Sequence, residues 1–307
     1  HTAMPLEELL SAWTGTLEKI FPTHAEKKEL THEIGLYIQR NQEAPAIKSA
    51  KPRVFIPAFP GTNCEVDTAR AFERAGAIAD ILVVKNLTPN DIEETIEEMV
   101  RSINEAQIVM LPGGFSGGDE PDGSGKFIAT TFRNPKIKAA VSHLLEHRDG
   151  LMLGICNGFQ ALIKLGLVPY GKITEPSPQA PTLTFNTIGR HISRMVYTRV
   201  TSVKSPWLSG VNAGDVFTVP VSHGEGRFVA SDAVMQQLIE NGQVAFQYTT
   251  PCGKPSGDVK WNPNGSVCAV EGITSPDGRV LGKMAHSERL GNNLYKNVTG
   301  ETAKKMF

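Results

Sequence analysis

Apolar residues recur at helical spacing along the first forty residues of the chain. One run extends from Leu6 to Phe21, and a second continues through Ile38. This periodicity predicts two helices within residues 5–40. Residues 41–52 have the composition of a linker. The chain is therefore expected to divide into a helical appendage with its linker, 1–50, and a main body, 51–307.

The main body opens with short apolar runs that alternate with helix-like segments. Runs of four to six apolar residues are typical of strands that are buried on both faces of a parallel sheet. The predicted strands are 54–59, 81–84, 108–111 and 151–155, and the predicted helices are 65–75, 89–102, 135–147 and 159–165. This order predicts an α/β fold with a doubly wound, mostly parallel sheet. In such a sheet the ligand site lies at the carboxyl ends of the strands.

The second half of the main body has a different pattern. Short strand-like runs are separated by Gly, Pro and Asn, and only residues 231–241 have a clear helical pattern. We therefore expect an extra β-rich part after the alternating part. Its predicted strands are 182–186, 194–203, 216–221, 244–248, 267–273 and 279–285.

Composition and charge narrow the possible functions. The 307 residues carry 31 Lys and Arg against 32 Asp and Glu, a formal net charge of −1. A broad basic surface for nucleic acid is not expected. No run of apolar residues has the length of about 18 that spans a bilayer, so no membrane association is expected. The four cysteines are scattered and form no CxxC pair, which predicts neither a disulfide scaffold nor a structural zinc site. Sparse thiols suit a reducing cytoplasm.

One cysteine stands in a sequence that favours chemistry. Gly154-Ile155-Cys156-Asn157-Gly158 follows an apolar strand and precedes a helix. This is the nucleophile-elbow pattern, with Cys in place of Ser. A thiol at a helix N-terminus is stabilised as the reactive thiolate, and the backbone N–H groups that follow can stabilise an oxyanion. The competing interpretation of Cys156 is a buried small hydrophobic residue.

The other cysteines have weaker contexts. Cys64, in Pro-Gly-Thr-Asn-Cys, also follows a strand and opens a helix, but it lacks the second glycine and has no histidine nearby in the sequence. A structural role is the favoured interpretation of Cys64. Cys252 and Cys268 are in loop and strand contexts that indicate packing.

A cysteine nucleophile needs a base and a group that orients the base, and both can be distant in the sequence. His286 follows a predicted strand, and in an extended chain Glu288 lies on the same side as His286. His223, between a strand and a glycine turn, is a second candidate for catalysis or ligand binding. His143 and His147 could share a helix face for a metal, but no third ligand is evident.

Four motifs occur together and in order. They are Pro-Gly-Gly-Phe-Ser at 112–116, Gly-Ile-Cys-Asn-Gly-Phe-Gln at 154–160, Ser-His-Gly-Glu-Gly at 222–226 and His-Ser-Glu-Arg at 286–289. Together they resemble the class I, or triad, glutamine amidotransferases. The Pro-Gly-Thr-Asn-Cys segment and the His-Gly-Glu-Gly segment narrow the resemblance to the glutaminase domains of phosphoribosylformylglycinamidine synthases. It covers about residues 51–307 and implies a flavodoxin-like fold.

The resemblance assigns roles to individual residues. It implies that Cys156 attacks the side-chain amide of glutamine, that His286 transfers protons and that Glu288 orients His286. It places the oxyanion hole at Gly114 or Phe115 together with Asn157. The residues that it implies for the glutamine pocket are Gly113, Gln160, Ser222, His223, Gly224 and Glu225. No metal ligand is implied.

The resemblance also implies what lies outside these residues. It assigns ATP and Mg²⁺ to a synthetase region of the full enzyme, and no cofactor to this chain. Residues 5–40 resemble the end of that region in the large, single-chain form, and the start at His1 fits a piece of a longer chain. The loop 116–126 fails the P-loop pattern at Glu120 and Phe127, which favours a lid or docking loop.

Two other functions stay open at this point. Flavodoxin-like proteins with an elbow cysteine include peptidases and glyoxalase-type enzymes. A non-catalytic docking domain with a vestigial pocket is the third possibility.

Overall fold

Two types of strand pairing meet in the central sheet. The computed structural model describes residues 3–20, 33–41, 48–115, 125–289, 294–295 and 298. In this part of the chain nine strands form one sheet in the order β2-β1-β3-β4-β11-β10-β9-β6-β7, and β5 and β8 form a small second sheet. The pairs from β2 to β11 are parallel, and the pairs from β11 to β7 are antiparallel. The strands are β1 (Arg53–Ala58), β2 (Ile78–Val83), β3 (Ile108–Leu111), β4 (Leu151–Ile155), β5 (Thr182–Phe185), β6 (Ile192–Val200), β7 (Val216–His223), β8 (Glu225–Val229), β9 (Val244–Thr249), β10 (Val270–Thr274) and β11 (Val280–Lys283).

The parallel part has the flavodoxin-like strand order. Read from the edge, β2-β1-β3-β4-β11 is the order 2-1-3-4-5. Its last strand, β11, comes from the far end of the chain, because β5 to β10 are inserted between β4 and β11. This confirms the expected α/β fold with a mostly parallel sheet and a β-rich second half. It also brings residues near 286 beside residues near 156.

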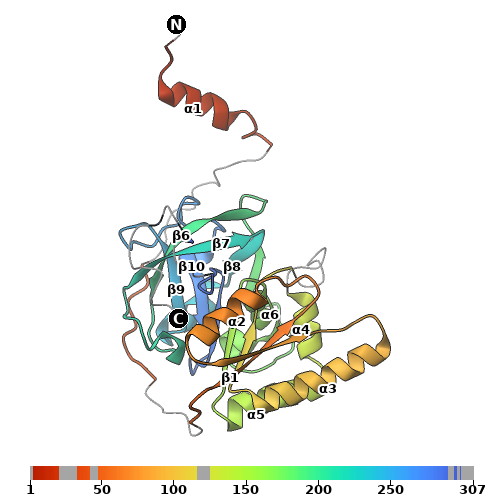
Figure 1. The fold of residues 1–307 in the computed structure, drawn as a ribbon. Coiled ribbons are helices and arrows are strands. Elements are labelled where there is room, and N and C mark those ends of the chain that lie inside the picture. The colour runs from red at the N-terminus through yellow and green to blue at the C-terminus, as the bar shows by residue number, and fades with distance from the viewer. Residues whose placement is uncertain are drawn as a thin grey trace.

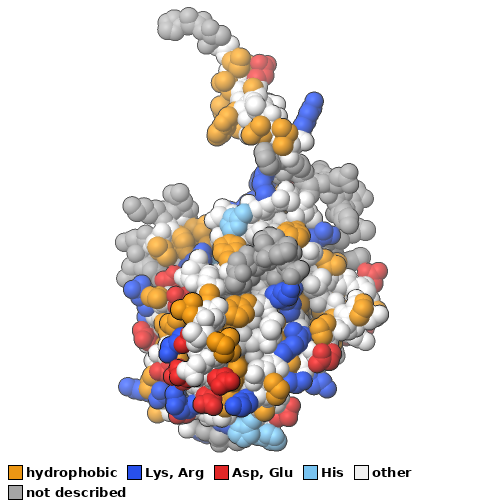
Figure 2. All heavy atoms as spheres, turned by 90° about the vertical axis from the view of Figure 1, so that its right-hand side faces the viewer, with side chains coloured by type: hydrophobic (Ala, Val, Ile, Leu, Met, Phe, Trp, Pro, Cys, Tyr) orange, Lys and Arg blue, Asp and Glu red, His pale blue; other side chains and the backbone are white. Residues whose placement is uncertain are grey.

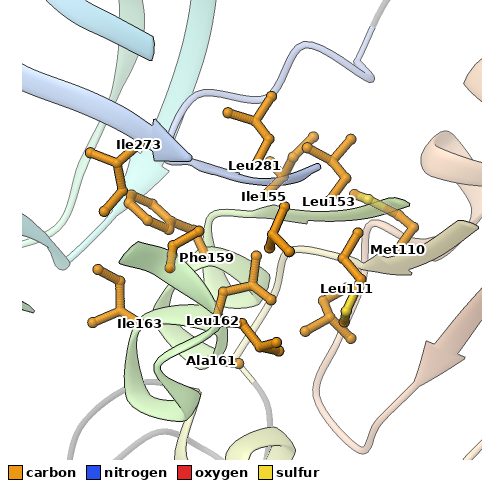
Figure 3. Packing of buried hydrophobic residues seen from close by; sticks show 14 of the residues in the cluster. Met110, Leu111, Leu153, Ile155, Phe159, Ala161, Leu162, Ile163, Ile273 and Leu281 are labelled. Carbon is orange, nitrogen blue, oxygen red and sulfur yellow. The ribbon is translucent and has the colours of Figure 1, made fainter. Parts of the chain in front are cut away.

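Helices cover both faces of the parallel part (Figure 1). They are α2 (Glu65–Arg74), α3 (Pro89–Glu105), α4 (Lys126–Phe132), α5 (Pro135–His147), α6 (Asn157–Leu165) and α7 (Leu167–Tyr170), and α8 (Asp232–Glu240) follows in the β-rich half. Helix α3 begins at a capping box between Thr88 and Asp91. Figure 3 shows Phe159 and Leu162 of α6 directed at β3, β4 and β11 in the core.

One predicted helix is wrong in the part that the structure describes. The apolar spacing through Ile38 predicted a helix, but residues 33–41 have no helical structure. Tyr37 instead forms a parallel bridge with Ser202, and Arg40 donates to the carbonyl oxygen of Leu208 at 2.9 Å. These distant partners outweigh the local helical pattern. The segment before residue 51 is therefore only partly helical, and residues 33–41 pack on the main body.

The other helix expected in this region is present. Helix α1 (Leu6–Gly15) stands apart from the rest of the molecule, and none of its residues is buried (Figure 1). Its exposed apolar side chains, with Trp13 at 80% exposure, gather along it in Figure 2. In the described residues no helix is both long and apolar enough to cross a bilayer.

Candidate active site

Cys156 stands at the sharp turn between β4 and α6. It is the residue immediately before the helix, with φ 53° and ψ −108°, a left-handed backbone conformation that a side chain rarely adopts. Such strain persists where the surrounding structure enforces it, and it is found at active sites. The side chain is 5% exposed, and Sγ lies 3.7 Å from the carbonyl oxygen of Ser222. The elbow predicted from the sequence is therefore present.

The two glycines of the elbow are required by close packing. A Cβ atom at Gly158 would lie 2.0 Å from the carbonyl oxygen of Leu111 on β3. A Cβ atom at Gly154 would lie 2.6 Å from both the carbonyl oxygen of Gly158 and a methyl group of Leu162. The first turn of α6 therefore rests directly on the strand ends, and this contact fixes where Cys156 points.

His286 and Glu288 follow β11 and are joined by a short hydrogen bond. His286 Nδ1 and Glu288 Oε1 are 2.6 Å apart, and both side chains are about 1% exposed or less. The backbone N–H of His286 also donates to the carbonyl oxygen of Pro220 on β7. Because Nδ1 donates its proton to Glu288, Nε2 is the nitrogen available for proton transfer. His286 Nε2 is buried, and within the described residues it has no hydrogen-bond partner.

The charges of the site oppose the effect of burial. Burial acts to lower the His286 pKa, but Glu288 and Cys156 outweigh it and hold this pKa well above the usual value. Burial likewise acts to raise the Glu288 pKa, but the charge and hydrogen bond of His286 bring it below the usual value. The structure therefore favours an imidazolium–carboxylate pair of His286 and Glu288.

Cys64 contacts the triad histidine, although 222 residues separate them. Cys64 Sγ lies 3.9 Å from His286 Nδ1 and accepts a hydrogen bond from Arg289 Nη2 at 3.1 Å. Gly113 separates the two cysteines: a Cβ atom there would lie 2.7 Å from His286 Cε1, 3.2 Å from Cys64 Sγ and 3.4 Å from Cys156 Cβ. No histidine is near Cys64 in the sequence, so its closeness to the triad histidine could not be predicted. The other two cysteines are less buried: Cys252 is exposed and Cys268 is half-buried.

The side chains of Cys64, His286 and Glu288 are of the types that bind metal ions. Donor atoms of Cys64, His286 and Glu288 all lie within 4.8 Å of one another. A cation among them would face the guanidinium of Arg289 and would have to break the bond between His286 and Glu288. We therefore assign His286 and Glu288 to acid–base chemistry, with Cys64 beside them.

The loop after β3 lies beside Cys156 and offers backbone donors. The N–H of Phe115 donates to the carbonyl oxygen of Gly61 at 2.9 Å, which ties this loop to the loop after β1. Of the two positions offered by the sequence, Gly114 is then the better candidate for an oxyanion donor. Asn157 opens α6 at the positive end of the helix dipole, where N–H groups favour negative charge. Most of the next loop, 116–124, lies outside the described residues.

Two of the residues predicted to line the glutamine pocket, Gln160 and Ser222, lie close to Cys156. Gln160 is 4% exposed, and its amide joins Asn157 Nδ2 to the carbonyl oxygen of Glu225. Ser222 presents its carbonyl oxygen to Cys156 and its hydroxyl to His191 Nε2 at 3.1 Å. The structure thus brings these residues beside the nucleophile, and their contact with glutamine stays a prediction.

His223 is buried, and Asn186 contacts both its ring and its backbone. Its Nδ1 lies 3.1 Å from Asn186 Oδ1, and Asn186 also bonds the backbone of His223 and Gly224. Burial lowers the His223 pKa to about 3, helped by the charges of His286 and His191. His223 is therefore neutral at neutral pH, which argues against a role as a second base, and its contact with glutamine stays a prediction. Sequence reasoning missed Asn186, whose only signal is its place as the last residue of the predicted strand 182–186.

The chain is similar to known proteins of one kind. A model of the CobB/CobQ-like glutamine amidotransferase domain matches residues 51–307. The phosphoribosylformylglycinamidine synthase subunit PurQ of Methanococcus maripaludis is 34% identical over 239 residues, 78% of this chain and 82% of that protein. The subunit of the same name from Ruegeria sp. strain TM1040 is 34% identical over 245 residues, 80% of this chain and 92% of that protein. A chain in the structure of PurLQS from Thermotoga maritima is 27% identical with a TM-score of 0.59, covering 83% of this chain and 95% of that one.

Proposed function

The chain belongs to the CobB/CobQ-like glutamine amidotransferase family, and we propose that it is the glutaminase component of a phosphoribosylformylglycinamidine synthase, with Cys156 as its nucleophile. The observation that carries this assignment is the meeting of three residues. A strained elbow cysteine lies beside an imidazole that is hydrogen-bonded to a buried carboxylate. This is the arrangement that nucleophilic acyl transfer needs.

The first half of the reaction releases ammonia. With its proton transferred to His286 Nε2, Cys156 Sγ attacks the side-chain carbonyl carbon of glutamine, and the carbonyl oxygen becomes an oxyanion. Backbone N–H groups at Gly114 and Asn157 stabilise that oxyanion. The carbon–nitrogen bond then breaks, His286 Nε2 gives its proton to the departing nitrogen, and a γ-glutamyl thioester remains on Cys156.

The second half restores the thiol. His286 Nε2 takes a proton from water, and the hydroxyl attacks the thioester carbonyl. The carbon–sulfur bond breaks, Sγ recovers the proton held by His286 Nε2, and glutamate leaves. Throughout both halves Glu288 keeps the proton on His286 Nδ1, so that Nε2 alone exchanges protons.

The ammonia released from glutamine is used by a synthetase region. We propose that this region, joined to the chain in one polypeptide, binds ATP and Mg²⁺ and converts formylglycinamide ribonucleotide to formylglycinamidine ribonucleotide in purine biosynthesis. The names of the relatives, a synthase subunit and a PurLQS assembly, support a synthetase partner. The sparse, free thiols support a cytoplasmic location. Alone, the chain is expected to hydrolyse glutamine slowly, because coupling of this kind requires an ordered site.

One experiment separates the glutaminase reaction from the synthetase reaction. The enzyme that contains this chain and its synthetase is assayed with either glutamine or ammonium chloride as nitrogen donor. C156A is expected to lose glutamine-dependent activity by about 10³-fold or more and to keep ammonia-dependent activity. C252A, which changes an exposed cysteine, is the matched control and should keep both. Use of glutamine by C156A would refute the proposal, as would faster turnover of a peptide or a glyoxal than of glutamine by the wild-type enzyme.

A further inference from the structure

A second pair of buried charges lies next to the triad. Lys283 is the last residue of β11, and Glu271 is on the neighbouring strand β10. Lys283 is 2% exposed and Glu271 is fully buried, with Lys283 Nζ 3.8 Å from Glu271 Oε1. Burying two charges is costly, and their attraction repays that cost only when the geometry is good. A buried ion pair at this place in the sheet, where apolar side chains could pack instead, therefore suggests a functional role for the two charges.

Lys283 contacts both halves of the triad. Its carbonyl oxygen accepts the backbone N–H of Cys156 at 2.8 Å. Its ammonium lies 3.4 Å from the hydroxyl of Ser287, the residue between His286 and Glu288. One residue thus connects the elbow that carries the nucleophile with the turn that carries the acid–base pair.

Glu271 holds that turn from the other side. Its Oε1 accepts the backbone N–H of Ala285 at 2.7 Å, and its carbonyl oxygen accepts the backbone N–H of Met284 at 3.1 Å. These two bonds fix the peptides that lead directly into His286. A carboxylate that accepts a backbone N–H forms a charge-assisted bond, which is stronger than a neutral one.

Lys283 lies on the face of the sheet away from the expected glutamine site. Gly282 packs against the ring of Phe159 in α6, so Lys283, the next residue along the strand, projects from the opposite face. There its ammonium lies 5.0 Å from the centre of the Phe246 ring, and it borders a pocket with Phe72 of α2. Substrate is expected on the side of Cys156 and α6.

We propose that Lys283 and Glu271 form a positioning pair that holds the His286–Glu288 turn in register with Cys156. This inference rests on the glutaminase reaction proposed above. It assigns these residues no contact with substrate: they act through His286 and Glu288.

The pair also contributes charge to the histidine. In the part of the chain that the structure describes, the groups that face His286 are Glu288 on its own turn, Cys64 before α2, Cys156 before α6, Glu271 on β10, His223 on β7 and Tyr295 after the turn. Glu271 stabilises the imidazolium, whereas the positive charge of Lys283 is felt by Glu288. Removal of the carboxylate should therefore lower the His286 pKa, and removal of the ammonium should raise it.

The test uses the complete enzyme and compares K283M, E271Q and the double variant K283M/E271Q. For each single variant kcat for glutamine hydrolysis is expected to fall about 10- to 100-fold with little change in KM, because the acid–base pair is displaced. The apparent pKa in the profile of kcat/KM against pH should rise in K283M and fall in E271Q. In the double variant this pKa should return toward the wild-type value while kcat stays low. K283R, which keeps the charge, should recover part of kcat.

A matched control lies at the other end of the same strand. Arg279 forms an ion pair with Asp277 at 2.8 Å just before β11, and R279M should leave the pH profile unchanged. Thermal unfolding reports how much of each variant is folded.

Three results would overturn the inference. They are single variants whose pKa values do not move in opposite directions, a rise in KM with kcat unchanged, and a double variant with the kcat of the wild type. The double variant avoids an unpaired buried charge, so it decides the matter even where a single variant does not fold. Absence of glutamine hydrolysis by the wild-type enzyme would instead refute the proposed function.

Discussion

The two halves of the triad are held by different physical means. The nucleophile is positioned by the backbone: Cys156 has φ 53°, and no side chain fits at Gly158. The acid–base pair is positioned by charge, through the 2.6 Å bond of His286 to Glu288 and the buried carboxylate of Glu271. The steric positioning of the nucleophile depends on residues that are adjacent in the sequence. The electrostatic positioning of the acid–base pair depends on groups from several strands. Variants of the two halves should therefore fail in different ways.

Among variants that keep Cys156, the largest expected effect on catalysis comes from the charged half. E288Q keeps the size of the side chain and an acceptor for His286 Nδ1, but it removes the negative charge that stabilises the imidazolium. We expect kcat for glutamine hydrolysis to fall by about 10²- to 10⁴-fold, with the protein still folded. Steady-state kinetics together with circular dichroism check this. An E288Q enzyme with kcat near the wild type would show that the carboxylate does not serve the reaction.

The steric half should fail through stability. G158A places a methyl group 2.0 Å from the carbonyl oxygen of Leu111, a backbone atom that cannot move without displacing β3. We expect the free energy of unfolding to fall by about 4 kcal/mol or more, because overlap with backbone is among the most destabilising changes. Urea unfolding measures it, with G15A, where no atom lies within 4 Å, as the control. Wild-type stability in G158A would contradict the account of the elbow.

A third prediction uses pH to examine His223. The His223 pKa is about 3 in the folded protein and about 6.5 in an unfolded chain, so between these values only the unfolded state takes up the proton. The free energy of unfolding should fall as pH drops below about 6.5, with a contribution from His223 of at most about 1.4 kcal/mol per pH unit.

H223Q should remove that contribution, because glutamine does not titrate. Urea unfolding between pH 7 and pH 4 measures the slope, and H147Q, which changes an exposed histidine, is the control. An unchanged slope in H223Q would show that His223 is protonated readily in the folded state.

The smallest effect is expected at Cys64. C64S retains a small acceptor for Arg289 and fits the same space, so glutamine hydrolysis should stay within about fivefold of the wild type. Kinetics with glutamine check this. A loss of activity as large as that of C156A would show that Cys64 is itself required for the reaction.

The sequence predicts features that depend on adjacent residues and misses those that depend on distant ones. The strands 108–111 and 151–155 and the helix 135–147 were predicted with the bounds that the structure has, because buried apolar runs and a proline at the helix start are local signals. The β8 strand was missed because Glu225 and Gly226 were interpreted only as a motif. The helix expected through Ile38 failed because its partners come from residues near 200.

The site shows the same limits. The elbow at Cys156 was predicted from five adjacent residues, since its geometry is local. The contacts of Cys64 with His286 and Arg289, and of Lys283 with Glu271, join residues on different strands or helices. No spacing in the sequence indicates such pairs, because they depend on the order of strands in the sheet.

The most direct test of the account is to identify the residue that becomes acylated. The complete enzyme is mixed with glutamine, quenched in acid during turnover, digested and analysed by mass spectrometry, beside C156S and C64S. We predict a γ-glutamyl thioester on the peptide that contains Cys156, in the wild type and in C64S. A thioester on Cys64, with Cys156 unmodified, would contradict the central claim.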